Sequence, residues 1–276
     1  MTPSALKKQF ESDFFHSGIE TPAVDAALLI EELCGISKLE ILLNPAQELS
    51  SAAEARLRAA ALRRCRREPL QYITGKACFR NLELKVTPDV LIPRPETELL
   101  VDEIIRELPP GGTLLDIGTG SGAIAVSAAD ERRDIRVTAV DISPQALEVA
   151  KENARRAGVE ICFLQSDLFS ALEGKRFDYI AANLPYVTDE EYLTLAPEVR
   201  EHEPRLALTA PESGFALIRK TAEKLKDHLT PAGKAGFELD PQQAARLQKL
   251  LTDSGFAARI LKDLTGRERF VLAKQK

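Results

Sequence analysis

The stretch Leu114–Ala129, LLDIGTGSGAIAVSAA, places three glycines between a short apolar run and a run of helix-forming residues. A glycine loop in that position allows a tight turn and lets a ligand approach the backbone closely. The spacing of Gly118, Gly120 and Gly122 is G-x-G-x-G, which differs from the G-x-G-x-x-G of dinucleotide binders. The stretch therefore predicts a doubly wound α/β domain that binds a ligand other than a dinucleotide.

Two acidic residues narrow the choice of ligand. Asp116 lies just before the glycines, where a carboxylate repels a pyrophosphate but suits an ammonium group. Asp141 ends the next apolar run, where a carboxylate can accept both hydroxyls of a ribose. The loop and the two acids together fit S-adenosylmethionine better than NAD.

The segment Asp167–Phe169 is a candidate for the adenine end of that ligand. Leu168 and Phe169 are apolar, and the Asp167 carboxylate can accept a hydrogen bond from an exocyclic amine. A helix cap is an equally good interpretation of Asp167. The sequence leaves both interpretations open.

From Thr113 onward, short apolar runs alternate with helical stretches such as 143–158 and 214–229. Near-continuous apolar strands that alternate with helices imply a mostly parallel sheet covered on both faces. The predicted strands are 113–118, 135–141, 160–167, 177–186, 232–240, 258–264 and a final one at 267–275.

The first part of the chain has a different sequence pattern. Residues 1–68 read as helices only, residues 69–95 as a linker with a short β-hairpin around Asn81-Leu82, and residues 96–276 as the α/β domain. The helix predicted at 51–67 is rich in arginine. A solvated basic face is the plain interpretation, and a docking surface for an acidic or nucleic-acid-bearing partner is the alternative.

Bulk composition excludes several classes of protein. No apolar segment approaches the length needed to cross a membrane, so the cytoplasm is the expected location. The four cysteines and three histidines are scattered, which argues against a metal site or a disulfide framework. A formal net charge of -5 argues against a protein that coats nucleic acid.

The motif Asn183-Leu184-Pro185-Tyr186 ends the fourth predicted strand, at the same edge of the sheet as the glycine loop. The Asn183 side-chain carbonyl and the backbone carbonyl of Leu184 can accept the two hydrogens of a planar NH2 group. Pro185 favours an extended backbone before it, and Tyr186 can lie against the flat face of a substrate. Such a clamp suits a weak amine nucleophile, either an adenine amine or a carboxamide, and orientation alone can supply about 7–11 kcal/mol of the barrier.

These features resemble the class I methyltransferases and, more closely, the peptide chain release factor N5-glutamine methyltransferases of the HemK/PrmC family. The resemblance covers essentially the whole chain. It is carried by the blocks EPLQYITGKACFRNLELKV, LIPRPETELLV, LLDIGTGSGAIA, ANLPYV, EVREHEPRLAL and DLTGRERFVLAKQ, of which IPRPETE (92–98) is the most discriminating.

The resemblance implies a Rossmann-like class I methyltransferase sheet behind a small helical domain that docks the substrate. It implies methylation of the glutamine in the Gly-Gly-Gln motif of class I release factors. Nothing in the sequence demands an oligomer, a membrane or nucleic acid, so a monomer is expected. Asn183 and Tyr186 are the implied catalytic residues, and Asn183, Leu184, Pro185 and Tyr186 the implied substrate site. The implied S-adenosylmethionine contacts are Gly118, Thr119, Gly120, Ser121, Gly122, Asp141, Leu168 and Asn183.

Two positions depart from the family pattern. Leu184 stands where the family has proline, and Leu168 where it often has a larger aromatic residue. Asn-Leu-Pro-Tyr is also similar to the motif of rRNA adenine dimethyltransferases, so N6-methylation of adenine in rRNA or DNA is one alternative. Methylation of a glutamine in ribosomal protein uL3 is another, and a non-catalytic cofactor-binding module is a third.

Overall fold

Seven strands form one sheet in the second part of the chain, and the computed structural model describes all residues from 1 to 276. The strand order is β5-β4-β3-β6-β7-β9-β8. Neighbours from β5 to β7 run parallel, whereas β9 runs antiparallel to β7 and β8. The prediction of a mostly parallel sheet with a final strand is confirmed. The bounds are β3 Thr113–Ile117, β4 Arg136–Asp141, β5 Ile161–Gln165, β6 Phe177–Asn183, β7 Leu229–Glu238, β8 Phe256–Lys262 and β9 Glu268–Gln275.

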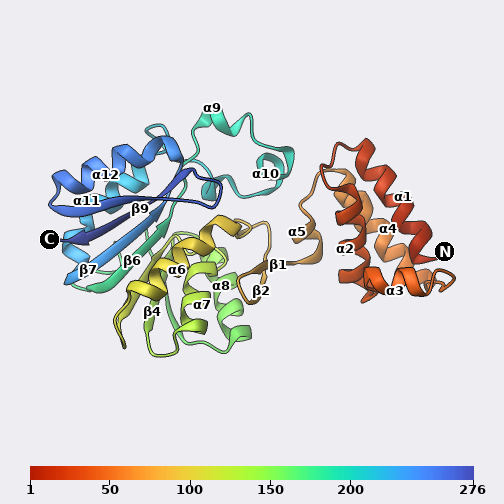
Figure 1. Ribbon diagram of the computed structural model, residues 1–276, viewed down its shortest axis with the longest axis horizontal. Helices are drawn as coiled ribbons and strands as arrows, with labels where there is room; N and C mark the ends of the chain where they lie inside the picture. The colour runs from red at the N-terminus through yellow and green to blue at the C-terminus, as the bar shows by residue number, and fades with distance from the viewer. The chain divides into compact units, whose positions relative to one another are not determined.

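Helices cover both faces of the sheet (Figure 1). On one face lie α6 (Glu98–Glu107), α7 (Ala123–Glu131) and α8 (Pro144–Ala157), and on the other lie α11 (Ala216–His228) and α12 (Ala244–Asp253). Each face buries its own apolar layer, so the strands are apolar on both sides and read as continuous runs. This two-layer burial leaves the carboxyl ends of the strands as the edge on which a ligand site can form.

Helix α8 shows how local sequence sets an element. The Ser143 hydroxyl accepts a hydrogen bond from the Ala146 N–H, and Pro144 occupies the first helical position. Gly158 ends the helix in the left-handed region, with φ +63°. Start and stop signals in the sequence therefore predict this helix almost to the residue.

The predicted hairpin consists of β1 (Lys76–Phe79) and β2 (Leu82–Lys85). Its turn lies at Arg80-Asn81, one residue earlier than predicted, because Arg80 takes a positive φ of 52° and Leu82 already belongs to the second strand. Phe79 and Leu84 are buried in the apolar layer beneath α6 and α7. The hairpin therefore packs as part of the α/β unit.

The chain divides into two compact units. The first comprises residues 1–76 together with 196–202, and the second comprises residues 77–195 and 203–276. The first unit extends past the predicted boundary at residue 68 because α5 (Leu70–Thr74) contributes Ile73 to its apolar core. Its other helices are α1 Pro3–His16, α2 Pro22–Cys34, α3 Lys38–Leu43, α4 Ser51–Cys65 and α10 Pro197–His202.

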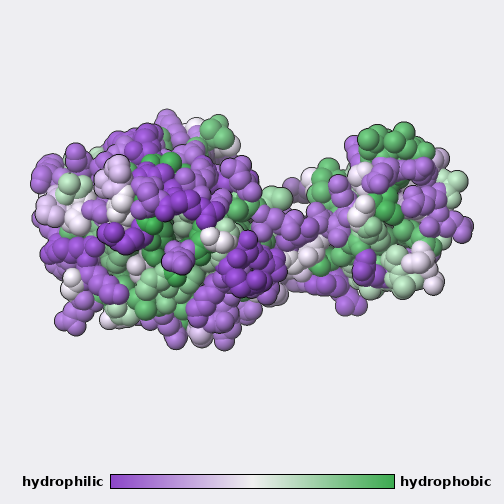
Figure 2. All heavy atoms as spheres, turned by 90° about the horizontal axis from the view of Figure 1, so that it is seen from below, coloured by the Kyte–Doolittle hydropathy of each residue, from purple (hydrophilic) through white to green (hydrophobic).

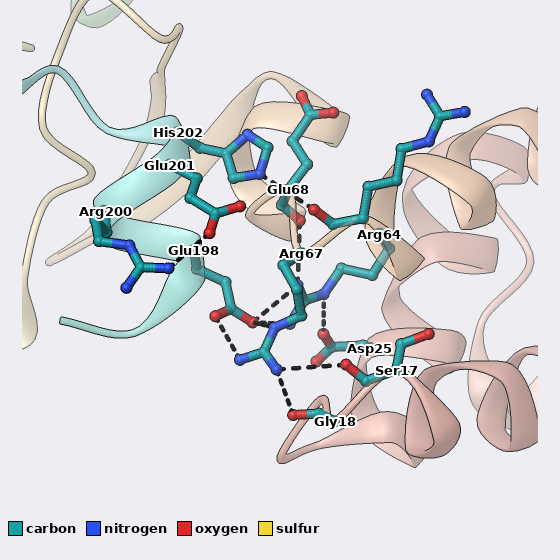
Figure 3. Close-up of polar contacts among 11 residues, drawn as sticks. Ser17, Gly18, Asp25, Arg64, Arg67, Glu68, Glu198, Arg200, Glu201 and His202 are labelled. Atoms are coloured by element: carbon teal, nitrogen blue, oxygen red, sulfur yellow. Dashed lines mark hydrogen bonds and ion pairs between the residues drawn. The ribbon is translucent and has the colours of Figure 1, made fainter. Parts of the chain in front are cut away.

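Within the first unit, Glu198 of α10 is held by Arg64 and Arg67, two arginines three positions apart at the end of the arginine-rich segment (Figure 3). Arg64, whose side chain is 8% exposed, donates from Nε to Asp25 Oδ2 at 2.7 Å and from both terminal nitrogens to Glu198 Oε1 at 3.1 Å. Arg67 binds both oxygens of Glu198, at 2.7 and 2.6 Å. Arg64 and Arg67 therefore bind within the unit. Arg56, Arg63 and Arg66 are exposed, which agrees with a solvated basic face.

The remaining short elements are η1 Pro95–Thr97, α9 Asp189–Tyr192, η2 Arg205–Ala207 and η3 Pro241–Gln243. None of the helices is both long enough and apolar enough to cross a membrane.

Candidate functional site

A cavity of about 500 Å³ lies in the second unit at the carboxyl ends of the parallel strands. Its walls come from the glycine loop after β3, the ends of β4 and β6, the segment after β5 and the loop before α6. Nearly all the residues that the sequence predicts for the site meet here. These lining residues are Gly118, Thr119, Gly120, Ser121, Asp141, Leu168, Asn183, Leu184 and Pro185.

The glycine loop is shaped by its own backbone. Gly118 and Gly120 have φ values of +72° and +55°, which favour glycine, and the Gly118 N–H donates to the Val140 carbonyl at 2.8 Å. A Cβ at Gly118 would lie 3.0 Å from Leu184 Cδ2, whereas one at Gly120 would meet nothing within 4 Å. The loop thus lies directly against the Asn-Leu-Pro-Tyr motif and keeps its Gly120 side open toward the cavity.

Gly122 has a different place from the other two glycines. It caps the N-terminus of α7 with φ +83°, and a Cβ there would lie 3.0 Å from Val126 and 3.1 Å from Ala150. It therefore allows α7 to pack closely on α8, and it is not among the residues that line the cavity.

Asp141 joins the glycine loop to the start of α8. Its Oδ2 accepts a hydrogen bond from the Gly120 N–H and its Oδ1 accepts one from the Ser143 N–H, both at 2.9 Å. Burial raises the pKa of this carboxyl, and these backbone donors counteract the rise. Each carboxylate oxygen keeps a further lone pair for an O–H donor, so the residue fits the two hydroxyls of a ribose.

The surroundings of Asp116 show whether the glycine loop can hold a cationic ligand group. Its side chain is 1% exposed, its Oδ2 accepts a hydrogen bond from Thr119 Oγ1 at 2.6 Å, and its Oδ1 has no hydrogen-bond partner. Burial raises the pKa of this carboxyl to about 7. A buried carboxyl with an unused oxygen is costly unless a donor or cation complements it. The loop therefore fits the ammonium group of S-adenosylmethionine.

The segment after β5 decides between two interpretations of Asp167. No helix follows this residue, because Leu168 takes a positive φ of 50° and the chain turns back toward β6. The helix-cap interpretation is therefore wrong. Asp167 is exposed and lines the cavity with Leu168, whose backbone carbonyl accepts a hydrogen bond from Ser166 Oγ at 2.8 Å. The contact of Asp167 with an adenine amine stays a prediction.

Asn183 is the last residue of β6 and presents its amide to the cavity. Its Nδ2 donates to Thr97 Oγ1 at 3.2 Å, and its Oδ1 accepts no hydrogen bond from the chain. Because the two ends of an amide point in different directions, anchoring Nδ2 at Thr97 leaves Oδ1 as the end available to a ligand. Asn183 therefore offers an acceptor, which is what a bound NH2 group needs.

Leu184 and Pro185 follow Asn183 along the cavity wall. The Leu184 side chain is 4% exposed and packs in the apolar layer beneath α11 and α12. The departure from the family proline is thus accommodated by burial of the leucine side chain.

Tyr186 lies outside the set of cavity-lining residues. Its ring packs against the apolar layer, and burial raises the pKa of its hydroxyl to about 12, with the Glu238 carboxylate adding to the effect. Its backbone carbonyl accepts a hydrogen bond from Gln243 Nε2 at 3.2 Å, and a Cβ at Gly214 would lie only 1.8 Å from the same oxygen. The stacking role predicted for Tyr186 stays a prediction.

Sequence reasoning missed the residues that hold the cavity wall in place. Arg94 Nη2 donates to Glu203 Oε1 at 2.5 Å, and the Ile92 N–H donates to Glu203 Oε2 at 3.2 Å. Arg94 lines the cavity, and the Glu203 side chain is almost fully buried. This contact joins the blocks IPRPETE and EVREHEPRLAL in the fold, although 109 positions separate Arg94 from Glu203. In the sequence Glu203 lies between His202 and Pro204 in a charged stretch, and no local pattern marks it as the partner of Arg94.

Comparison with known families matches both parts of the chain. Residues 5–75 match the PrmC N-terminal domain, and residues 95–202 match the methyltransferase small domain. Among solved structures, a methyltransferase from Pyrococcus furiosus superposes with a TM-score of 0.55 at 20% identity, covering 82% of this chain and 98% of that one. A 16S rRNA N2 G1207 methyltransferase from T. Thermophilus gives the same TM-score and identity, covering 73% of this chain and 50% of that one. These two likenesses support the fold.

Curated relatives match over most of their length. A release factor glutamine methyltransferase of Deinococcus radiodurans is 39% identical, with 98% of this chain and 97% of the relative covered. The enzymes of the same name from Koribacter versatilis and Burkholderia pseudomallei are 37% and 41% identical, with 98% and 85% of each chain covered. The chain therefore belongs to the release factor glutamine methyltransferases, a family of enzymes whose cofactor is S-adenosylmethionine.

Proposed function

We propose that this chain transfers a methyl group from S-adenosylmethionine to the side-chain amide nitrogen, N5, of the glutamine in the Gly-Gly-Gln motif of class I peptide chain release factors. The observation that carries the proposal is the orientation of Asn183, whose Oδ1 is free to accept while its Nδ2 is bound to Thr97. Family membership supports the same assignment of substrate, because the curated relatives carry that name.

In this proposal the chain's own groups orient the glutamine. Asn183 Oδ1 and the Leu184 backbone carbonyl accept the two amide hydrogens, and this draws the nitrogen lone pair toward the cofactor side of the cavity. The chemistry that S-adenosylmethionine supplies is an electrophilic methyl group on a sulfonium. Neither acceptor is a strong base, and none is needed, because the amide proton becomes acidic only as the C–N bond forms. Orientation and removal of water are then the main contributions of the protein.

The proposed cofactor site uses the residues whose geometry fits it. Asp141 holds the ribose hydroxyls, Asp116 lies behind the loop as a counter-charge for the ammonium group, and the open side of Gly120 allows close approach of the ligand. Leu168 provides an apolar contact for the adenine. Tyr186 lies against the flat face of the substrate amide, and the hydrogen bond from Gln243 to its backbone carbonyl holds the loop that carries it.

The proposed partner is a release factor that contacts the first unit as well as the cavity. Hydrophobic patches interrupt the hydrophilic surface of this unit (Figure 2). On the short helix α3, Leu39, Leu42 and Leu43 are 63%, 70% and 68% exposed. Clusters of exposed apolar side chains are typical of protein-binding surfaces. We further propose that the enzyme acts in the cytoplasm, as a monomer, without nucleic acid.

Transfer of a labelled methyl group tests the proposed function. The chain is incubated with labelled S-adenosylmethionine and a release factor, in parallel with a release factor that carries Gln→Ala in its Gly-Gly-Gln motif. Label is expected in the first protein and absent from the second. Equal labelling of both, or label that appears only in added RNA or DNA, would contradict the proposal.

A further inference from the structure

Glu238 is a buried acid for which the proposed function has no role so far. It is the last residue of β7, and its side chain is 1% exposed with Oε2 lacking a hydrogen-bond partner. In the parallel pairing of β6 with β7 it stands opposite Asn183. An acid at the end of an apolar strand is costly to bury, and the fold alone does not require one there.

Glu238 belongs to the same hydrogen-bond network as Asn183. Asn183 Nδ2 donates to Thr97 Oγ1 at 3.2 Å, and Asn183 stands opposite Glu238 in the pairing of β6 with β7. Side-chain hydrogen bonding from Thr97 and Asn183 lowers the pKa of the Glu238 carboxyl. A threonine hydroxyl has one hydrogen to donate, so Thr97 accepts from Asn183 and donates to Glu238. The carboxylate is therefore the final acceptor of the network.

We infer that Glu238 is a positioning residue that fixes the orientation of the Asn183 amide, so that Nδ2 faces Thr97 and Glu238 and Oδ1 faces the cavity; this inference rests on the function proposed above. An ionised carboxylate has no hydrogen to donate. A flipped Asn183 amide would place Oδ1 beside Glu238, oxygen against oxygen, and would turn Nδ2 toward the NH2 group of the substrate. Glu238 therefore excludes the orientation that cannot bind the glutamine.

The inference has a pH signature, because only the ionised carboxylate excludes the flipped amide. Burial raises the pKa of Glu238 to about 7, although the hydrogen bonds from Thr97 and Asn183 oppose the rise. A protonated carboxyl can donate a hydrogen bond to Oδ1 and so tolerates the flip. The other charged or titratable groups that face Glu238 come from η1, from the loop after β6 and from β9, and they are Glu96, Tyr186 and Arg269.

Kinetics across that pH range test the inference. In the wild-type enzyme, kcat for methylation of the release factor is expected to fall as the pH drops through about 7. Glu238→Gln can donate or accept, so kcat is expected to fall about tenfold at high pH and to lose this inflection, with KM for S-adenosylmethionine changed less than about twofold. Thr97→Val, which removes the hydroxyl, is expected to resemble Glu238→Gln, whereas Thr97→Ser is expected to resemble the wild type. Glu103→Gln, a buried glutamate in another ion-pair cluster, serves as the control.

A measurement without substrate separates this inference from the proposed function. The side-chain NH2 signals of Asn183, assigned by comparison with Asn183→Ala, are followed by NMR as the pH passes through 7. They are expected to titrate in the wild type and to stay constant in Glu238→Gln. Signals that do not titrate in the wild type, or an unchanged kcat profile in Glu238→Gln and Thr97→Val, would overturn the inference. Titrating signals with no methyl transfer to the release factor would support it and contradict the proposed function alone.

Discussion

Two carboxyl groups beside the cavity, Asp116 and Glu238, are almost fully buried, and burial raises the pKa of each to about 7. The folded chain therefore binds more protons than the unfolded chain between about pH 4 and pH 7. Their stabilising contribution is present at the acid end of this window and is lost as the pH rises through 7. The folded chain is thus least stable when both carboxyl groups are ionised. That same state suits a cationic ligand beside Asp116 and fixes the orientation of the Asn183 amide.

For Asp116 we expect Asp116→Asn to separate stability from ligand binding. Relative to the wild type, its free energy of unfolding should rise by on the order of 4 kcal/mol as the pH increases from 4 to above 7, because the buried charge is gone. Its affinity for S-adenosylmethionine should fall at least about tenfold, since the counter-charge for the ammonium group is lost. Urea unfolding and calorimetric titration check the two effects. An exposed control, Asp253→Asn, should show neither, and parallel pH curves for Asp116→Asn and the wild type would contradict the expectation.

Alanine substitutions at Asn183 and Leu184 should have different effects, the first on turnover and the second on stability. Asn183→Ala removes the acceptor, so kcat should fall at least about a hundredfold while cofactor affinity changes little. Leu184→Ala removes a buried side chain but keeps the backbone carbonyl, so the free energy of unfolding should fall by about 2–4 kcal/mol while kcat falls much less than in Asn183→Ala. Kinetics and urea unfolding of both variants distinguish the roles. If Leu184→Ala impaired turnover as strongly as Asn183→Ala, its side chain and not its carbonyl would act in the site.

At the scale of elements, the sequence predicts what depends on local pattern. All seven strands follow from apolar runs, and α8 follows from Ser143, Pro144 and Gly158. The turn after Asp167 could not be predicted in this way, because leucine gives no indication that Leu168 takes a positive φ. The network around Asn183 was also hidden, since 86 positions separate it from Thr97 and only the folded sheet brings Glu238 beside it.

The loop after β6 depends on a contact between elements that only glycine permits. A Cβ at Gly214 would lie 1.8 Å from the Tyr186 carbonyl oxygen, with φ at +74°. We expect Gly214→Ala to displace this loop, lowering the free energy of unfolding by about 2 kcal/mol or more and kcat at least about tenfold. Gly174→Ala is the matched control, with φ +71° and nothing within 4 Å of the new Cβ, and should cost only the backbone strain. Equal loss of activity in both variants would mean that backbone strain, and not the clash with Tyr186, is responsible.

At the scale of the whole molecule, the first unit is discontinuous in sequence. The predicted division at residues 68 and 95 treats it as one continuous stretch, but residues 196–202 belong to it. Nothing in the composition of EVREHEPRLAL marks this membership, which depends on the ion pairs of Glu198 with Arg64 and Arg67. Loss of Glu198 would leave Arg64, which is nearly buried, with Asp25 as its remaining acidic partner.

We therefore expect Glu198→Ala to destabilise the first unit. Removing one member of a largely buried ion-pair cluster leaves a desolvated cation without full compensation, and the free energy of unfolding should fall by on the order of 2–3 kcal/mol. Glu201→Ala is the control in the same helix, because its partner Arg200 and Glu201 itself are 36% and 51% exposed, and it should cost less than about 1 kcal/mol. Hydrogen exchange of the amides in α2 and α4 locates the effect. Unchanged protection of these helices in Glu198→Ala would show that residues 196–202 contribute nothing to the stability of the unit. The helices within residues 1–76 would then be stable without them.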